Sequence, residues 1–548
     1  MFKENIQNNQ IDFYGIENIL TQEKLLQLKE SEEYFFYQII FKNINEKSFS
    51  ELYSNKKSRP NAAINCLVAA LILLTRKGWT YEELFEHIDF DLKTRYALGL
   101  TDLNETPFCR ATIFNFQNRL SKYYFDNKID LLEKVFEELT EEQIKALKIK
   151  TDIQRSDSTL ASSNIRNYSR LQLIIEILLR LYRILSDEDK LIFNNELSEY
   201  TKQSSENYIY KFKRDDIPHK LEQLGEIYYK LYNNLKDKYH FEEIFKIFER
   251  VYFEQFHVIE EKVTVKSNEE LNSSMLQSPD DADATYRKKK DKESKGFIIH
   301  ASETCNPENQ FQLVTDVVVE KNNVDDSKIL SDRLDKMKEK TPDLNEEHTD
   351  GGYGSIENDQ KMEELGILHV QTAVRGRKAK VEMTITKNNS VYEVSCPIQR
   401  AEVVKTKKRF KAIFDLNKCN ECPFHEDCPG IKSKDKMVLY FTSEDYLKNK
   451  RQRNILNIPK TKRKLRPNIE ATMKEYHGSM INNKLKTRGL IKAGFYAITM
   501  SISINFGRIY RYCVSNPNEK TRITIKILYF YFIFSLISNK FIKKVRFV

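Results

Sequence analysis

Two features are scarce in this chain: glycine, with 15 residues in 548, and long apolar runs. The longest apolar run, residues 527–537, is too short for the roughly 20 residues that a membrane-spanning helix needs. The N-terminus is polar and lacks the charged and then apolar segments of a signal peptide. The sequence therefore predicts a cytoplasmic protein with no membrane partner.

Neither sign of charge is in large excess. The chain has 89 Lys and Arg against 80 Asp and Glu, which gives a net charge of +9. Because the placement of charge matters more than its total, this excess is only weak evidence for a nucleic-acid partner. At about 150 residues per domain, the chain is long enough for three or four domains.

Eight cysteines in a chain of this size do not indicate a disulfide framework. Cys419, Cys422 and Cys428 instead have the C-x2-C-x5-C spacing of a metal knuckle, in which a tight turn lets the first pair grip one ion. A tetrahedral zinc site needs a fourth ligand, for which Cys396 is our choice and His425 the rival. Such a site is structural, and the alternative interpretation is a set of free thiols.

The spacing of apolar residues predicts an α/β protein, because helical and strand-like segments alternate along the chain. The predicted segments are helices within 60–145 and 168–260, strands near 296–304 and 311–320 that can pair as a hairpin, helices near 326–340 and 355–366, and a strand near 367–374. Leu147, Ile149 and Ile153 share one parity, which predicts another strand with Asp157 on the same face.

Residues 349–355, TDGGYGS, concentrate glycine beside one carboxylate. Taken alone, Asp350 there and Asp157 in QRSDST can be turn or cap residues, and Asp152 competes with Asp157. Glu470 can be an ordinary first-turn glutamate favoured by the helix dipole, in a helix that we expect to begin at Pro467.

Taken together, five separated motifs resemble one family. QRSDSTLASSNIRNYSRLQLIIEIL, SPDDADATYRKK, TDGGYGS, the cysteine knuckle and RPNIEATMKEYHG follow one another as in DDE transposases of bacterial insertion sequences. The closest resemblance is to the IS eleven-eighty-two group, related to the IS four superfamily. It covers about residues 50–510 and includes the helical stretch that begins at residue 59.

The resemblance implies a ribonuclease-H-like catalytic core with an N-terminal helical domain, a helical insertion and a small zinc-knuckle insertion. The expected divisions are 1–145 for the N-terminal helical domain that binds DNA ends, 146–510 for the catalytic domain, 168–260 and 385–445 for its two insertions, and 511–548 for a C-terminal tail.

The resemblance also implies the active site. Asp157 matches the family's first aspartate, at the end of the first core strand, Asp350 matches the second, after the fourth strand, and Glu470 matches the glutamate on a later helix. These carboxylates would hold two Mg2+ ions, with Mn2+ able to substitute, because magnesium favours hard oxygen ligands. Gly351 and Gly352 would let the chain turn off the strand and let a DNA backbone approach without meeting a Cβ.

A basic segment precedes Glu470. Residues 448–466 hold nine Lys and Arg and no acidic residue, which predicts a strip along DNA phosphates or, alternatively, a solvated loop. The predicted DNA-binding residues are Lys460, Lys462, Arg463, Lys464, Arg466, Lys474 and His477. Related transposases carry Tyr, Arg, Glu and Lys in a signature here. Arg466 and Glu470 match it, whereas Arg463 replaces the tyrosine and His477 the lysine.

The function implied is that of a bacterial, nucleoid-associated transposase. It would bind its element's ends as a homodimer or higher oligomer, cut DNA with metal-activated water, and join the freed 3′-hydroxyl to target DNA. The alternatives are a ribonuclease-H-like nuclease that cuts without joining and a DNA-binding protein that has lost catalysis.

Overall fold

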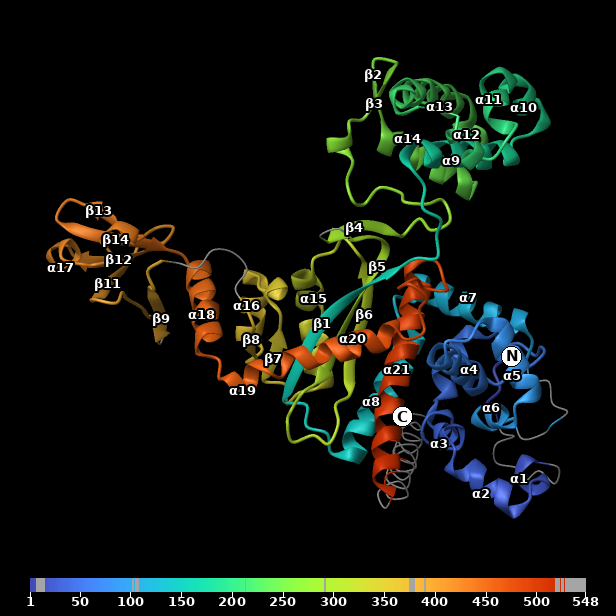
Figure 1. Ribbon diagram of the computed structural model, residues 1–548, viewed down its shortest axis with the longest axis horizontal. Helices are drawn as coiled ribbons and strands as arrows, with labels where there is room; N and C mark the ends of the chain where they lie inside the picture. The colour runs from blue at the N-terminus through green and yellow to red at the C-terminus, as the bar shows by residue number, and fades with distance from the viewer. Residues whose placement is uncertain are drawn as a thin grey trace, which may run out of the picture.

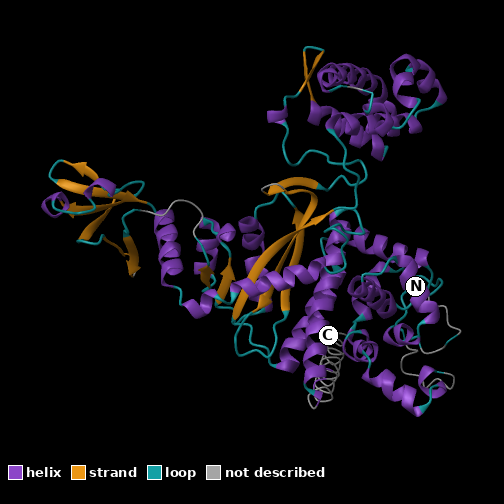
Figure 2. Cartoon of the chain, in the orientation of Figure 1, coloured by secondary structure: helices purple, strands orange, loops and turns teal. Residues whose placement is uncertain are grey.

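The computed structural model describes residues 1–5, 15–100, 103, 108–211, 213–289, 292–373, 380–388, 391–517, 523 and 527. It is a mixed α/β structure, as the apolar periodicity predicts, with two arms that extend from a central body (Figures 1 and 2). Within the described residues, no helix combines the length and the apolar character needed to cross a membrane. Most of the predicted tail, 511–548, lies outside the described residues.

Helices make up the N-terminal part of the chain. Their bounds are α1 Ile16–Ile19, α2 Gln22–Glu30, α3 Glu32–Ile39, η2 Phe41–Asn43, η3 Glu46–Leu52, α4 Ile64–Lys77, α5 Tyr81–Phe90, α6 Leu92–Ala97, α7 Arg110–Asn127 and α8 Leu131–Leu147. The almost uniformly apolar α4 is buried along most of its length and ends at Gly78, whose φ of 66° favours glycine.

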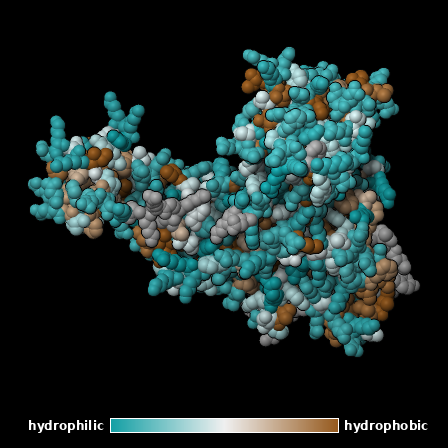
Figure 3. Space-filling model, turned by 45° about the horizontal axis from the view of Figure 1, so that its top comes forward, coloured by the Kyte–Doolittle hydropathy of each residue, from teal (hydrophilic) through white to brown (hydrophobic). Residues whose placement is uncertain are grey.

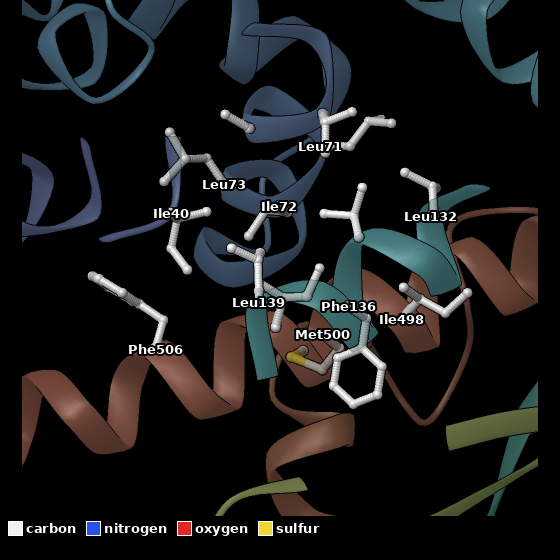
Figure 4. Packing of buried hydrophobic residues seen from close by; sticks show 14 of the residues in the cluster. Ile40, Leu71, Ile72, Leu73, Leu132, Phe136, Leu139, Ile498, Met500 and Phe506 are labelled. Carbon is white, nitrogen blue, oxygen red and sulfur yellow. The ribbon is translucent and has the colours of Figure 1, made fainter. Parts of the chain in front are cut away.

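The longest helix, α21 (Leu490–Ser515), joins these N-terminal helices to the rest of the body. Figure 4 shows Ile498, Met500 and Phe506 of α21 packed among residues of α4 and α8. The same helix contacts strand β6 (Val314–Lys321), so one hydrophobic core continues from the N-terminal helices to the central sheet. The predicted boundary at residue 510 falls inside α21, because Cys513 continues its buried face.

The central sheet has six strands. They are β1 Ile153–Ser162, β4 Thr285–Lys289, β5 Lys292–Thr304, β6, β7 Glu346–Thr349 and β8 Leu368–Gln371. β1 is antiparallel to β5, and β6 is antiparallel to β5, which confirms the predicted hairpin. β7 is parallel to β1 and to β8. The crossover from β6 to β7 is α15 (Asp326–Lys340), and α16 (Ile356–Glu364) connects β7 to β8.

The first strand differs from its prediction. Leu147 is the last residue of α8 and β1 begins only at Ile153, so the parity argument from Leu147 was wrong. Because β1 continues to Ser162, Asp157 lies in the middle of the strand, not at its end. The strand extends to Ser162 because it pairs with the long β5 along this whole stretch.

Strand β7 is polar and yet fully buried. Its sequence is Glu-Glu-His-Thr, and each side chain has a polar partner, which is what makes such burial tolerable. Glu346 accepts hydrogen bonds from His348 and Lys462, and Glu347 accepts one of 2.6 Å from Ser156. Burial raises the pKa of Glu347 to about 8, which keeps this carboxyl neutral at pH 7.

The first arm is helical, as predicted for residues 168–260. It comprises α9 Arg170–Ile184, α10 Asp187–Ile192, α11 Asn194–Thr201, α12 Ser205–Ile209, η4 Arg214–Asp216, α13 Ile217–Tyr239, α14 Glu243–Gln255 and the hairpin β2 Phe256–Ile259 with β3 Lys262–Val265, and it is followed by η5 Asn268–Glu270. These helices enclose a hydrophobic core of their own, centred on aromatic residues such as Tyr228 and Phe248.

The second arm is a six-stranded antiparallel sheet. Its elements are β9 Thr384–Asn388, β10 Val391–Ser395, β11 Arg400–Lys405, β12 Phe410–Asp415, α17 Leu416–Asn420, η7 His425–Asp427, β13 Ile431–Ser433 and β14 Lys436–Phe441. It also has a separate core. The chain returns to the central sheet through α18 Ser443–Asn457, α19 Lys460–Arg463, η8 Arg466–Asn468 and α20 Ile469–His477 (Figure 1).

Candidate active site

Three predicted carboxylates surround one guanidinium. Nη2 of Arg466 lies 2.7 Å from Oδ2 of Asp157 and 4.0 Å from Oδ2 of Asp350. Nη1 of the same residue lies 3.4 Å from Oε1 of Glu470. The structure therefore brings together Asp157, Asp350 and Glu470, which are far apart in the sequence, at one position beside the central sheet.

The register of β1 and β7 explains the pairing of the two aspartates. Arg155 of β1 lies opposite His348 of β7 in a parallel ladder. Asp157 and Asp350 each follow two residues later, so they reach the same level and the same face of the sheet. The Asp157 side chain is 14% exposed and that of Asp350 is 42% exposed.

The glycines after Asp350 have a local role. Asp350 is the cap residue of η6 (Gly351–Tyr353), and its Oδ1 accepts a hydrogen bond of 2.7 Å from the backbone N–H of Gly352. A Cβ on Gly352 would lie 2.9 Å from that same oxygen, closer than real Cβ contacts allow. Glycine at 352 thus lets the chain turn onto the carboxylate and fix its orientation, which supports the predicted sharp turn.

Glu470 lies on the exposed side of α20. This helix begins at Ile469, because Pro467 belongs to the preceding 3-10 turn η8, so the predicted start at Pro467 was two residues early. Ile469, Met473 and Tyr476 are buried, whereas the Glu470 side chain is 62% exposed and Lys474 is also exposed.

A buried carboxylate positions α20. Glu303 of β5 is inaccessible to solvent, and its Oε1 lies 2.5 Å from Nη2 of Arg155. Its Oε2 lies 2.6 Å from Nη1 of Arg508 in α21 and accepts a hydrogen bond of 2.7 Å from Thr472 in α20. Burial alone would raise the pKa of Glu303, but Arg508 and Arg155 lower it below its ordinary value.

Arg155 also holds the segment that carries Arg466. Its Nη1 donates a hydrogen bond of 2.5 Å to the carbonyl of Leu465, the residue before Arg466. The backbone that carries Arg466 is therefore attached to β1, two residues from Asp157.

The site has an uneven electrostatic environment. Burial raises the pKa of Asp157 above its ordinary value, and Arg466 opposes that shift. His477 is half-buried, which lowers its pKa, and its Nε2 lies 2.6 Å from Oγ1 of Thr159 on β1. A neutral His477 can donate or accept a hydrogen bond at this position.

The predicted basic strip does not form one free surface. Lys460 and Lys464 are exposed. Lys462 forms an ion pair with Glu346 at the edge of β7, and Nη2 of Arg463 donates a hydrogen bond of 3.0 Å to the carbonyl of Ile455 in α18.

The four predicted zinc ligands line one small cavity. Cys396, Cys419, Cys422 and Cys428 surround a space of about 20 Å³ together with His425. Gln399 donates hydrogen bonds of 3.3 Å to Cys396 and 3.2 Å to Cys419, and Gly430 donates one of 3.4 Å to Cys428. Nδ1 of His425 lies 3.1 Å from the carbonyl of Cys419.

Neither this cavity nor the carboxylate site is arranged around an ion. Among the residues that the structure describes, no three His, Cys, Asp or Glu side chains lie in an arrangement that could hold a metal as they stand. At the carboxylate site the guanidinium of Arg466 occupies the space between the oxygens.

Several residues of the site are absent from the sequence-based prediction. Arg155, Glu303 and Arg508 position α20, and Ser158 donates a hydrogen bond to Asp326, which also lies 3.3 Å from Arg287. Asp152, the rival of Asp157, accepts a hydrogen bond of 2.8 Å from Asn306 and belongs to the turn before β1. Only two of these residues could have been suspected from the sequence. Arg155 shares the parity of Asp157, and Arg287 lies in the motif SPDDADATYRKK.

Two family models match parts of the chain. The family described as Transposase DDE domain matches residues 374–510, and the family described as Transposase domain (DUF772) matches residues 21–119. Together they support a DDE-type transposase family, and hence an enzyme that acts on DNA. Arg466 and Glu470 lie within the first range, whereas Asp157 and Asp350 lie in neither. No curated protein and no solved structure matches the chain.

The buried network predicts a large effect of Glu303 on stability. Glu303→Gln leaves buried Arg155 without a counter-charge and leaves Arg508 with only the partly exposed Glu475, and it should lower the free energy of unfolding by about 3–5 kcal/mol. Glu475→Gln is the matched control, because Glu475 pairs with the same Arg508 at 3.0 Å but is 32% exposed, and its effect should be about 1 kcal/mol or less. Urea unfolding of the full chain, followed by circular dichroism, measures both. Equal effects would contradict the role given to Glu303.

Proposed function

From the DDE-type transposase family that these matches support, we propose that the protein is the transposase of a bacterial insertion sequence of the IS eleven-eighty-two group, within the IS four superfamily. It binds the ends of its element, cleaves DNA and transfers the freed strand to target DNA. The observation that carries this proposal is the convergence of Asp157, Asp350 and Glu470 on one cation.

The arrangement of strands supports a ribonuclease-H-like core. β6 pairs antiparallel with β5 and β5 pairs antiparallel with β1, and β7 and β8 continue the sheet parallel to β1. Asp350 directly after β7 and Glu470 on a later helix agree with the positions that the resemblance implies, whereas Asp157 lies in the middle of β1 instead of at its end.

The donor set fits divalent cations. The three carboxylates offer hard oxygen atoms, and a cationic group, Arg466, already lies among them. Asp157, Asp350 and Glu470 would hold two Mg2+ ions, or Mn2+ in their place. Such ions, when bound, activate an attacking oxygen and stabilise the leaving oxygen of an in-line displacement at phosphorus.

The residues of this chain provide position and charge. In the first step a water oxygen bonds to the scissile phosphorus and the 3′ oxygen leaves with a proton. In the second step that 3′-hydroxyl bonds to a phosphorus of target DNA, and a target 3′ oxygen leaves. Lys474 and His477 lie one turn apart on α20, as does Glu470 from Lys474, and we propose that they contact the phosphates that flank the reacting one.

We propose that DNA also contacts a cavity beside the N-terminal helices. A cavity of about 900 Å³ lies between α4, α5 and the segment before α21, and its lining includes Trp79, Lys295, Lys484, Lys486 and Lys492. Hydrophilic residues also cover most of the face shown in Figure 3. Basic and aromatic groups together are typical of surfaces that follow a nucleic-acid strand.

On DNA we propose that the protein acts as a homodimer or higher oligomer in the nucleoid.

The second arm is proposed to hold one structural zinc ion. Its four cysteines are thiol ligands of the type that zinc favours, and three of the four sulfurs accept N–H hydrogen bonds, which stabilise thiolates. Cys396 is preferred over His425 as the fourth ligand, because it completes a set of four thiols around the same cavity.

The carboxylates are tested by removing one charge at a time. Asp157→Asn, Asp350→Asn or Glu470→Gln should each lower metal-dependent cleavage at least about 1,000-fold, because each removes a proposed metal ligand, and should leave binding to element ends largely intact. Asp152→Asn is the control and should cleave normally. The assays are cleavage and strand transfer on labelled element ends.

Each outcome of these assays has a clear meaning. Normal cleavage by Asp350→Asn would remove this carboxylate from the mechanism. Cleavage without strand transfer by the wild-type protein would favour the nuclease, and metal-independent binding alone would favour a DNA-binding protein without catalysis.

The basic segment is tested by salt dependence. The double variant Lys460→Ala, Lys464→Ala should flatten the plot of log affinity against log salt by about 1.8 on end and random duplexes alike, because each exposed lysine contributes about 0.9. Lys462→Ala should flatten this plot less than Lys460→Ala or Lys464→Ala alone, since Lys462 already pairs with Glu346. An unchanged slope for the double variant would assign the segment to a solvated loop.

The zinc proposal is tested by metal analysis. The purified protein should contain one zinc per chain, and Cys419→Ser should lose the metal and lower the melting temperature of the arm. Cys305→Ser, at a buried cysteine outside the cavity, should retain the zinc. A full complement of titratable thiols in the wild-type protein without zinc would contradict the proposal.

A further inference from the structure

Arg466 is placed as the cation of the carboxylate site. It is the one residue whose charged group contacts all three carboxylates in the described part of the chain, and its side chain is only 16% exposed. The charges are unbalanced, since one guanidinium lies among three acids. The site therefore retains a net attraction for further cations.

A divalent ion and the guanidinium compete for the same oxygen. Nη2 of Arg466 lies 2.7 Å from Oδ2 of Asp157, whereas a bound Mg2+ lies about 2.0–2.1 Å from its ligand oxygens. Two cations at such distances from one oxygen repel each other strongly in a site that excludes much of the solvent. Metal binding consequently requires the guanidinium to move.

The structure favours movement of the side chain over movement of the helix. The carbonyl of Leu465 accepts a hydrogen bond from Arg155, and Thr472 in α20 is tied to Glu303, so the backbone on both sides of Arg466 is held. The guanidinium also has an unused donor. Its Nε is buried and has no hydrogen-bond partner among the described residues, which leaves half of its planar fork unsatisfied.

A phosphate group matches that unused donor. Two oxygens of a phosphate can accept parallel hydrogen bonds from Nε and one Nη of an arginine, and this fork geometry is the usual one for arginine and phosphate. DNA therefore offers the displaced guanidinium a better partner than the carboxylates do.

We propose that Arg466 is an exchangeable counter-ion. In the free protein it neutralises the carboxylates, and it is exchanged for divalent metal when a DNA phosphate takes its guanidinium. The inference rests on the proposed function in one respect, that these carboxylates bind the metal. It adds that bound DNA raises the affinity for metal and bound metal raises the affinity for DNA, both through the Arg466 side chain. The protein without DNA therefore binds metal weakly.

The test measures Mn2+ alone, by the electron paramagnetic resonance signal of the free ion, without DNA. Arg466→Gln should bind Mn2+ at least about tenfold more tightly than the wild-type protein, because a neighbouring cation typically changes the proton affinity of a carboxylate by one to three pKa units. Lys464→Gln, which removes the same charge at an exposed neighbour, should bind Mn2+ as the wild-type protein does. Arg466→Lys keeps the charge and should also remain weak.

A second arm of the experiment adds an end duplex. DNA should tighten Mn2+ binding to the wild-type protein, and it should have much less effect on Arg466→Gln, since coupling between two ligands is reciprocal and passes through this residue. Melting curves of the variants show whether each is folded.

The outcomes distinguish a failure of the Arg466 exchange from a failure of the proposed metal site. Equal or weaker Mn2+ binding by Arg466→Gln would overturn the exchange, and so would tightening by Arg466→Lys to the same degree. If neither the wild-type protein nor Arg466→Gln binds Mn2+, or if Asp350→Asn does not weaken Mn2+ binding, the proposed metal site itself fails. The exchange then fails with it.

Discussion

The pairing of buried Glu303 with Arg155 and Arg508 is the interaction on which the candidate site depends. It joins strands β1 and β5 to helices α20 and α21, and those four elements carry or support Asp157, Arg466 and Glu470. Charges buried in this way are costly unless each has a partner, so the network admits little variation in geometry. A site built from residues so far apart in sequence needs a constraint of this kind, because only tertiary contacts fix the relative positions of the elements that carry them.

A similar principle governs the strand that precedes Asp350. Apolar side chains would have made β7 an ordinary core strand, yet its four residues are polar and each forms at least one hydrogen bond with a polar side chain. Lys462 is one of those neighbours. A lysine that the sequence predicts to bind DNA thus contributes to the packing of the central sheet, and it connects the polar strand β7 to the basic segment.

The sequence predicts the type of several elements in the body better than the residues at which they begin. The structure confirms the helix at 326–340 and the hairpin of β5 and β6, because apolar periodicity is a local signal. It also confirms the strand before Asp350, which is polar and was implied only by the family resemblance. The start of β1 and the start of α20 were misplaced, because Leu147 and Pro467 fit two local structures equally well. Glu303 and Arg508 could not be predicted, since only the folded chain brings them together. The same holds for Lys462, whose partner depends on tertiary contact.

The helix α21 has a consequence for how such a protein can change over evolutionary time. Each of the two arms encloses its own core, so either can be lengthened, shortened or replaced without disturbing the sheet. The N-terminal helices have no such independence, because α21 fills their core and the core of the sheet at once. They form one folding unit with the central body. Exchanging these helices as a separate unit would therefore also remove part of the core of the central sheet.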